Sequence, residues 1–309
     1  MSVLIVGSLN MDLVVNLKRM PTPGETVLGE SFSTIAGGKG LNQAVASARA
    51  GAKVRIIGAL GSDPYAGILR AVLDRENIDH SRVLEFTGES GIALIEVDET
   101  GQNRIVVIAG ANGKLKSENF NPEVEEKILL AQLECPVNEL EEIFRKAKKS
   151  NYRTVLNPAP ATKLEPSFLA EIDILIPNEH EAKILTGITV TDMNSAEDAA
   201  RELILQGVAE VIITLAEKGA VYVSNEKVIY QPAYKVSAVD TTAAGDAFCG
   251  GLVSELSRGK SIEAALNFAA AAGGLASTKS GATPSLPTEK EIRSLQKAQG
   301  EKIVKYWRN

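Results

Sequence analysis

The chain has 309 residues, 44% of them hydrophobic, and a formal net charge of −6. This length suits one large α/β domain with an appendage, or two ordinary domains. It has no basic stripe and no interleaving of aromatic with basic residues, which argues against a nucleic-acid partner, and no apolar run approaches the roughly 20 residues of a membrane span.

The cysteines and histidines narrow the chemistry further. Cys135 and Cys249 are too few for a disulfide framework or a zinc site, and His80 and His180 are too few for a His-rich metal site. The first eight residues lack a basic segment and predict a first strand rather than a signal peptide. We therefore expect a cytoplasmic protein that works with carboxylates and backbone amides.

Residues 3–6 form a short apolar run, typical of a strand buried on both faces. It ends at Gly7-Ser8-Leu9-Asn10-Met11-Asp12, and polar residues at the carboxyl end of such a strand are where open α/β sheets contact ligands. Pro21-Thr22-Pro23-Gly24 is a turn signal, and the mixed alternation over 26–35 predicts strands exposed on one side. Residues 11–36 therefore form an excursion from the main sheet.

A glycine-rich loop, Gly37-Gly38-Lys39-Gly40-Leu41-Asn42-Gln43, opens a predicted helix that Gly51 closes. The glycines suit either close approach of a ligand or a simple helix-entry turn. The loop matches neither the Walker pattern nor the dinucleotide fingerprint. A strand over 54–60 and a helix from Asp63-Pro64 to about Arg75 follow. Residues 91–97 and 104–108 predict a hairpin, a partner for the first excursion in one small sheet.

From residue 109 onward, strands and helices alternate. We predict strands over 128–133, 154–156, 172–176 and 211–215, helices over 137–149 and 195–206, and a hairpin over 220–230. A helix rich in alanine and glycine over 261–277, a turn over 281–285 and a terminal helix over 288–298 complete the chain. A polar or glycine turn follows each strand, which favours a doubly wound, mostly parallel α/β sheet with one functional edge. We find no internal repeat and no clean break between two domains.

The stretch from Asp240 to Phe248 is the strongest single candidate for chemistry. Residues 234–239 predict the end of a strand, and a loop of small residues then enters a helix. The backbone N–H groups of Ala243, Ala244 and Gly245 would point out of a helix N-terminus, which favours an anion. Asp246, in the first turn, is either a general base beside that anion or only a charge that complements the helix dipole.

Several stretches together resemble the ribokinase family of carbohydrate kinases, over essentially the whole chain. The two signature regions are Gly37-Gly38-Lys39-Gly40-x-Asn42 and Asp240-Thr241-x-Ala243-Ala244-Gly245-Asp246. Further matches are the opening Gly7-Ser8-x-Asn10-x-Asp12, Pro21 to Thr26, Gly110-Ala111-Asn112, Gln132-Leu133-Glu134, Asn157 to Pro160, Pro177-Asn178-Glu179-x-Glu181 and Gly281-Ala282-x-Pro284-Ser285. The resemblance implies ATP-dependent phosphorylation of a sugar hydroxyl, with the 5-hydroxyl of D-ribose as the expected acceptor.

The resemblance also implies roles for individual residues. Asp246 matches the catalytic base, and the amides of Ala243, Ala244 and Gly245 match the anion hole that holds the γ-phosphoryl group. The positions that match sugar contacts are Asn10, Asp12, Gly38, Lys39, Asn42 and Glu134, together with Asp246 itself. Asn178 and Glu181 match a motif that orders Mg²⁺ and phosphate through water, which suits an ion that keeps its hydration shell.

The nucleotide is expected at a strand end and beside one helix. The matching positions are Asn178, Thr214, Leu215, Ala216, Glu217, Lys218, Gly219, Gly245 and Ala270. The family often carries glycine at the position of Ala216, in the nucleotide-binding loop. It often carries histidine beside the adenine, where this chain has Ala270, so we expect an apolar contact to the base. Positions matching a K⁺ site are Asp240, Thr242, Ala276, Lys279, Gly281 and Ser285, mostly through backbone carbonyls.

The two excursions match the small β-sheet lid of the family. We expect a main domain over 1–10, 37–90 and 109–309, and a lid over 11–36 and 91–108. The lid covers the sugar and pairs two subunits, so the chain is expected to form a homodimer. A small sheet buries little by itself, which favours a partner surface.

Other functions stay open. A kinase for 2-deoxyribose, fructose or adenosine would use the same chemistry, although a nucleoside would want stacking aromatics and Phe32 is the main one in the lid. A non-catalytic sugar-sensing relative would be expected to lose the base or the anion hole, and Asp246, Gly245, Asn178, Glu181 and Glu134 are all present. A dinucleotide-dependent oxidoreductase lacks its glycine fingerprint after the first strand.

Overall fold

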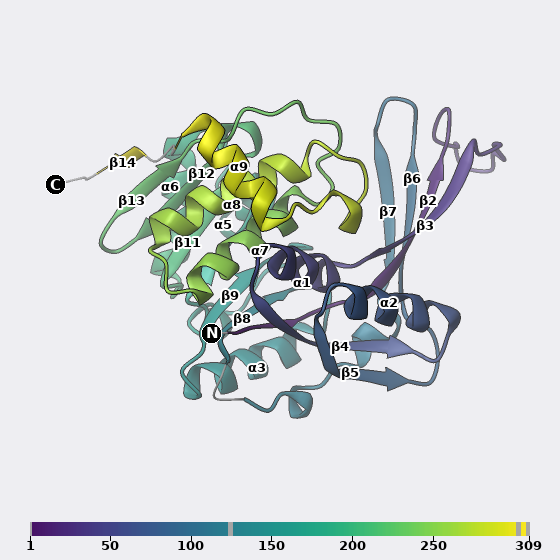
Figure 1. Ribbon diagram of the computed structural model, residues 1–309, viewed down its shortest axis with the longest axis horizontal. Helices are drawn as coiled ribbons and strands as arrows, with labels where there is room; N and C mark the ends of the chain where they lie inside the picture. The colour runs from purple at the N-terminus through teal and green to yellow at the C-terminus, as the bar shows by residue number, and fades with distance from the viewer. Residues whose placement is uncertain (1, 123–125, 301–303, 307–309) are drawn as a thin grey trace.

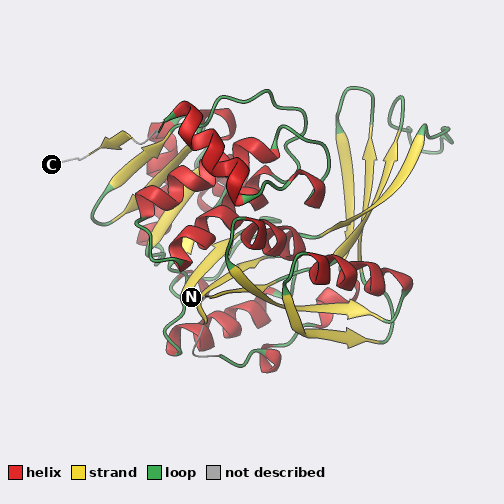
Figure 2. Ribbon diagram, viewed as in Figure 1, coloured by secondary structure: helices red, strands yellow, loops and turns green. Residues whose placement is uncertain are grey.

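Two separate sheets organise the molecule. The structure, a computed structural model, describes residues 2–122, 126–300 and 304–306. A ten-stranded sheet flanked by helices forms the main body, and a four-stranded sheet stands out from it (Figure 1, Figure 2).

The main sheet has the order β14-β13-β12-β11-β10-β9-β8-β1-β4-β5. The strands from β5 to β11 are parallel, and β12, β13 and β14 continue the sheet antiparallel. Their bounds are β1 Ser2–Val6, β4 Lys53–Gly61, β5 Asp79–Phe86, β8 Glu126–Gln132, β9 Arg153–Asn157, β10 Ile174–Leu175, β11 Glu210–Thr214, β12 Ala220–Ser224, β13 Val228–Gln231 and β14 Val304–Tyr306. The expected doubly wound, mostly parallel sheet is confirmed.

Alternation along β1 shows why both faces of this sheet are covered. Val3 and Ile5 belong to one hydrophobic core, whereas Leu4 and Val6 belong to the other. Successive side chains of a strand point to opposite faces, so a strand that is apolar throughout needs a helical layer on each side.

The helices form those two layers. Apolar side chains of α1, α2, α7, α8 and α9 join the first core, and those of α3, α4, α5 and α6 join the second. Their bounds are α1 Lys39–Arg49, α2 Pro64–Arg75, α3 Val137–Lys149, α4 Pro166–Leu169, α5 Glu179–Thr186, α6 Met193–Leu205, α7 Ala244–Ser257, α8 Ile262–Ala276 and α9 Glu289–Gln299. Short 3₁₀ turns are η1 Gly110–Lys114, η2 Ser117–Asn119, η3 Ala216–Lys218 and η4 Thr283–Ser285.

The second sheet joins the two excursions predicted from the sequence. Its order is β3-β2-β6-β7, with β2 Asn10–Asn16, β3 Ser31–Gly37, β6 Gly91–Val97 and β7 Asn103–Ile108. The central pair β2 and β6 is parallel, and both edge strands are antiparallel. β2 begins at Asn10 and β3 ends at Gly37, so both reach one residue beyond the expected excursion. The sheet rises directly from the residues that we expect to bind the sugar.

Some predicted elements differ from the structure. Residues 234–239 do not form a strand. Their backbone is held by helices instead, because the N–H of Lys235 donates to Gln299 Oε1 (3.1 Å) and that of Val239 to Ser277 O (2.7 Å). The predicted terminal helix is not the last element, since β14 follows it. The sequence patterns did not indicate β5 or α5, and β10 is shorter than expected.

Among the described residues, no helix combines the length and the apolar character needed to cross a bilayer.

Candidate active site

The carboxyl ends of β1 and β8 meet the start of α1. Lys39 N donates to Glu134 Oε2 (2.9 Å), and the hydroxyl of Ser8 donates to the same oxygen. Gly40 N donates to Ser8 Oγ (3.2 Å), and a Cβ on Gly40 would lie 2.5 Å from the backbone of Gly7 and Ser8. Only glycine allows this approach, so the glycine loop locks the start of α1 onto the end of β1.

Asp246 is held by two amides from the first turns of α1. Its carboxylate accepts from Asn42 Nδ2 at Oδ2 (3.0 Å) and from Gln43 Nε2 at Oδ1 (2.9 Å). The two helices can approach because Gly250 lacks a side chain, and a Cβ there would lie 2.5 Å from that of Ala46. Asp246 is only 6% exposed, and burial raises its pKa even though the charge of Lys39 and both amide donors oppose this.

Four carboxylates, those of Asp12, Glu134, Glu181 and Asp246, surround the charge of Lys39. Burial raises the pKa of Asp12 to about 7, and the charges of Glu134 and Asp246 contribute to that rise. Burial alone would lower the pKa of Lys39, but the attraction of Asp246, Glu134 and Glu181 outweighs it, so that pKa is raised. The cluster therefore holds Lys39 protonated and gives Asp12 and Asp246 an unusual affinity for protons.

Asn10 is oriented by a second asparagine. Asn112 Nδ2 donates to Asn10 Oδ1 (2.8 Å), while Asn112 Oδ1 accepts from Leu9 N (3.0 Å). Both side chains are buried. Because Asn10 Oδ1 is occupied, its amide nitrogen is the group left to donate to a ligand.

Asn178 and Glu181 cap the N-terminus of α5. Glu181 N donates to Asn178 Oδ1 (2.8 Å), and Asn178 N donates to Glu181 Oε2 (2.9 Å). Burial raises the pKa of Glu181, whereas the N–H of Asn178 and the charge of Lys39 lower it. The two residues form a reciprocal capping box that fixes both side chains.

The N-terminus of α7 lies beside Asp246. Ala244 N donates to Thr241 O (3.1 Å), so this predicted anion-hole amide is engaged within its own turn. Within the described part of the chain, no group accepts from the N–H of Ala243 or Gly245. Two of the three expected amides are therefore available to an anion in this arrangement.

The residues expected around a K⁺ ion lie in two loops that touch. Asp240 accepts from Thr242 N at Oδ1 (2.9 Å) and from Gly281 N at Oδ2 (2.9 Å). Burial would raise the pKa of Asp240, but these donors lower it, so the side chain is ionised near neutral pH. Ser285 Oγ donates to Ala282 O (2.9 Å), and Lys279 pairs with Glu291, which leaves only the backbone of Lys279 for a cation.

The predicted nucleotide loop follows β11. Ala216 has φ +46°, a left-handed conformation that glycine adopts more readily than alanine. Gly219 has φ +106°, and a Cβ there would lie 2.0 Å from Gln231 O. Thr214 pairs with Asn178, which joins this loop to the start of α5. Ala270 lies on α8 and is almost fully buried.

The site contains five further polar side chains to which the sequence analysis assigned no role. They are the hydroxyl of Ser8 and the amides of Gln43, Asn112, Gln132 and Asn157. All lie within or directly beside the motifs quoted above. Gln43 follows Asn42 in the glycine loop, and Gln132 ends β8 two residues before Glu134. Proximity to a motif was the only available signal, because their contacts join segments far apart in the chain.

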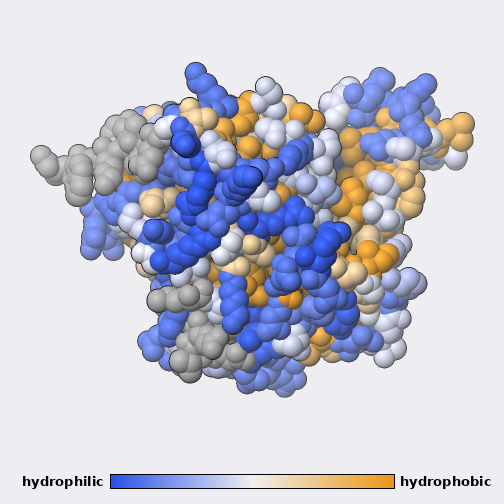
Figure 3. All heavy atoms as spheres, viewed as in Figure 1, coloured by the Kyte–Doolittle hydropathy of each residue, from blue (hydrophilic) through white to orange (hydrophobic). Residues whose placement is uncertain are grey.

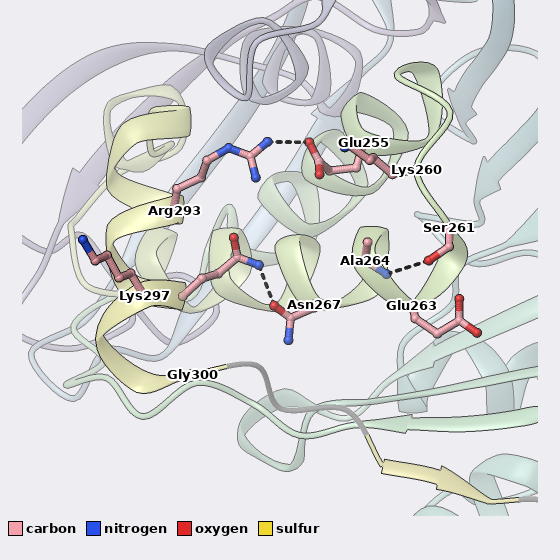
Figure 4. A pocket seen from close by; sticks show the side chains of 10 residues that line it. Glu255, Lys260, Ser261, Glu263, Ala264, Asn267, Arg293, Lys297 and Gly300 are labelled. Atoms are coloured by element: carbon pink, nitrogen blue, oxygen red, sulfur yellow. Dashed lines mark hydrogen bonds and ion pairs between the residues drawn. The ribbon is translucent and has the colours of Figure 1, made fainter.

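A hollow of about 540 Å³ lies elsewhere, between α8 and α9 (Figure 4). Its side chains already pair with one another. Arg293 Nη2 donates to Glu255 Oε1 (2.8 Å), and Gln296 Nε2 donates to Asn267 Oδ1 (2.5 Å). None of the predicted site residues lines it, so the hollow is distinct from the candidate active site.

Within the described ranges, no group of three or more His, Cys, Asp and Glu side chains is arranged to hold a metal ion.

Comparisons with known proteins identify the family of this chain. A family model described as pfkB family carbohydrate kinase matches residues 1–289. Ribokinase of Haemophilus influenzae is 41% identical over 293 residues, which are 93% of this chain and 95% of that protein. Deoxyribokinase of Salmonella typhi is 33% identical over 294 residues, with 93% and 96% covered. Arabidopsis thaliana ribokinase complexed with ribose and ATP superimposes with a TM-score of 0.89 at 32% identity, covering 96% of this chain and 98% of that one. The chain belongs to the pfkB family of carbohydrate kinases.

Proposed function

We propose that this protein is a ribokinase, which transfers the γ-phosphoryl group of ATP to the 5-hydroxyl of D-ribose. The observation that carries the proposal is the position of Asp246, a buried carboxylate next to unpaired amides at the N-terminus of α7, within the part of the chain that the structure describes. The similarity to ribokinases over nearly the whole chain supports the choice of sugar.

Asp246 acts as the general base. It accepts the proton of the sugar hydroxyl, whose oxygen then attacks the γ-phosphorus as the bond to ADP breaks. The raised pKa of this carboxylate improves its match to the hydroxyl proton. The amides of Ala243 and Gly245 stabilise the phosphoryl charge, and a small shift of the turn at Thr241 would free that of Ala244 as well.

The sugar is bound by the cluster at the carboxyl edge of the main sheet. Its members are Asn10, Asp12, Gly38, Lys39, Asn42 and Glu134. Carboxylates, amides and an ammonium group accept and donate hydrogen bonds in several directions, as a polyol requires. Asn10 and Glu134 are fixed by neighbouring residues, so the hydroxyl partners are preorganised.

ATP lies along the loop from Thr214 to Gly219, with its base near Ala270 and its phosphates between α5 and α7. Mg²⁺ neutralises the phosphate charge when it is bound. Each carboxylate oxygen of Glu181 accepts one hydrogen bond from Asn178 and keeps a further lone pair, which suits a hydrated ion held through water. A K⁺ ion would take the ionised Asp240 with carbonyls of the 276–285 segment, and an all-oxygen set fits a hard monovalent cation.

The four-stranded sheet serves as lid and as subunit interface. Its register places Asp12, Ala93 and Val107 on one face, and Leu13, Leu94 and Val106 on the other. The second face exposes Phe32 (63%), Leu94 (42%) and Val106 (59%), and hydrophobic side chains gather over this sheet in Figure 3. The face with Asp12 covers the sugar, and the apolar face meets the same face of a second copy.

A coupled assay of ADP release over ribose, 2-deoxyribose, fructose and adenosine tests the substrate. Ribose is expected to give the highest kcat/KM. The similarity to a deoxyribokinase makes 2-deoxyribose the second candidate. A higher kcat/KM for another substrate would refute the ribokinase proposal while leaving the phosphoryl-transfer chemistry in place.

A further inference from the structure

Gln43 lies beneath the carboxylate of Asp246 and is wholly buried. Its Nε2 uses both hydrogens, donating to Asp246 Oδ1 (2.9 Å) and to Asn157 Oδ1 (3.1 Å). Its Oε1 accepts from Gln132 Nε2 (2.6 Å). Gln43 is thus the centre of a relay of three side-chain amides that ends on the candidate base.

The direction of this relay is fixed from both ends by groups that can only accept. Asn157 Nδ2 donates to the backbone carbonyl of Ile176 (3.0 Å), which turns Asn157 Oδ1 toward Gln43. Nε2 of Gln43 must then face Asn157, and the Asp246 carboxylate requires the same orientation. Gln43 Oε1 is left for Gln132, which must turn its own Nε2 toward that oxygen. Gln132 Oε1 then lies near Gly7, where an added Cβ would come within 2.2 Å of it, and has no hydrogen-bond partner among the described residues.

We propose that Gln43 is a positioning residue that holds Asp246 in its reactive orientation, and that Gln132 holds Gln43. The inference rests on the proposed role of Asp246 as base. Gln43 is wholly buried beneath Oδ1, so Oδ2, which also accepts from Asn42, is the oxygen that receives the proton of the sugar hydroxyl. Oδ2 lies beside Asn42, a proposed sugar contact. Without Gln43 the carboxylate would keep only the hydrogen bond from Asn42 to Oδ2, so its rotation about χ2 would be less restricted and fewer encounters would place Oδ2 against the hydroxyl.

Gln43 also stabilises the ionised base. Its N–H favours the charged carboxylate and so lowers the pKa of Asp246, against the larger effect of burial. The other charged groups that act on Asp246 are Lys39, which lowers its pKa, and Glu134, which raises it. Asp246 in turn acts on Asp12, Glu181 and Cys249. All of these stay in place when Gln43 alone is changed.

The test compares Gln43→Met with wild type on the best sugar substrate, measuring kcat, KM and the pH dependence of kcat/KM. Methionine keeps the volume but donates nothing. We expect kcat to fall about 10- to 100-fold, the fall that loss of a hydrogen bond to a charged group produces. The KM for sugar should stay within about threefold, since Gln43 is buried away from solvent, and the acidic limb of the kcat/KM profile should move to higher pH.

Ser47→Ala is the matched control. Ser47 lies one turn further along α1, is equally buried and donates to Gln43 O (2.7 Å), but it does not touch Asp246. It should lose stability without a shift of the acidic limb. An unmoved limb with kcat within threefold of wild type in folded Gln43→Met, or an equal loss of kcat in Ser47→Ala, would overturn the inference.

If Gln43→Met does not fold, Gln132→Met tests the inference instead. It leaves Gln43 in contact with Asp246 but removes the donor that orients it, so we expect a 3- to 10-fold loss of kcat. A wild-type kcat in that variant would then refute the relay. Wild-type turnover in the same assay reports separately on the proposed function, so failure of one is distinguishable from failure of the other.

Discussion

Replacing Asp246 by asparagine should abolish turnover and spare the fold. Asparagine has nearly the same shape but cannot take a proton. Removal of a general base costs about 10²- to 10⁴-fold in rate, which corresponds to about 3–5 kcal/mol of transition-state stabilisation. Sugar and nucleotide affinity should change little, because most of the proposed contacts lie on other residues.

The structure explains why the protein should tolerate this change. The side-chain oxygen of the introduced asparagine can replace the carboxylate as acceptor for Gln43, whose orientation is fixed by the relay. The new NH₂ group would then face Asn42 Nδ2, but the amide of Asn42 can turn, because its Oδ1 is buried without a partner among the described residues. The substitution also removes a buried charge, so we expect the free energy of unfolding to change by less than about 2 kcal/mol.

The assay is single-turnover phosphoryl transfer, with calorimetric titration of sugar and nucleotide and urea unfolding as controls. A folded Asp246→Asn protein with kcat within tenfold of wild type would refute the general-base role. Loss of sugar and nucleotide binding together with kcat would mean that Asp246 organises the site rather than the proton transfer.

The remaining predictions concern four other parts of the molecule. Burial raises the pKa of Asp12 to about 7, so the folded state keeps a proton that the unfolded state releases above about pH 4. The free energy of unfolding should therefore fall from pH 4 to 7, and urea titrations of Asp12→Asn should show a smaller fall. Gly91→Ala should raise the KM for sugar at least about tenfold with a small effect on that for ATP, because the new Cβ would lie 2.0 Å from Asn10 Oδ1 and 2.2 Å from Asn112 Nδ2; equal KM values would contradict the role of Asn10. Activity at fixed Mg²⁺ should rise with K⁺ and lose this dependence in Asp240→Asn; identical rates in Na⁺, K⁺ and Cs⁺ would argue against a cation site. Val106→Glu should convert a dimer to monomers in light scattering, since a charge would enter an apolar interface; an unchanged mass would exclude this face as the interface.

The sequence predicted those features that local patterns determine. Asp63-Pro64 starts α2 as expected, with Asp63 accepting from Ala66 N. Asp246 lies in the first turn of α7, as the small residues before it indicated. In each case the signal lies within a few residues, so one stretch of sequence contains it.

Contacts over long sequence separations could not be predicted in the same way. The bond between Gln43 and Asp246 joins residues 203 positions apart, and no periodicity reports it. The apolar residues of 234–239 suggested a strand, but their backbone partners are Ser277 and Gln299, which only the packing of α8 and α9 supplies. Tertiary contacts there outweigh the local preference.

The product of the reaction tests the central claim most directly. Incubation of the protein with ATP, Mg²⁺ and D-ribose, followed by ³¹P and ¹³C NMR, should show one ADP for each phosphorylated sugar, with the phosphoryl group on O5. Phosphoryl transfer to another position of ribose, ADP formation that does not depend on the sugar, or no turnover with ribose would contradict the proposed function.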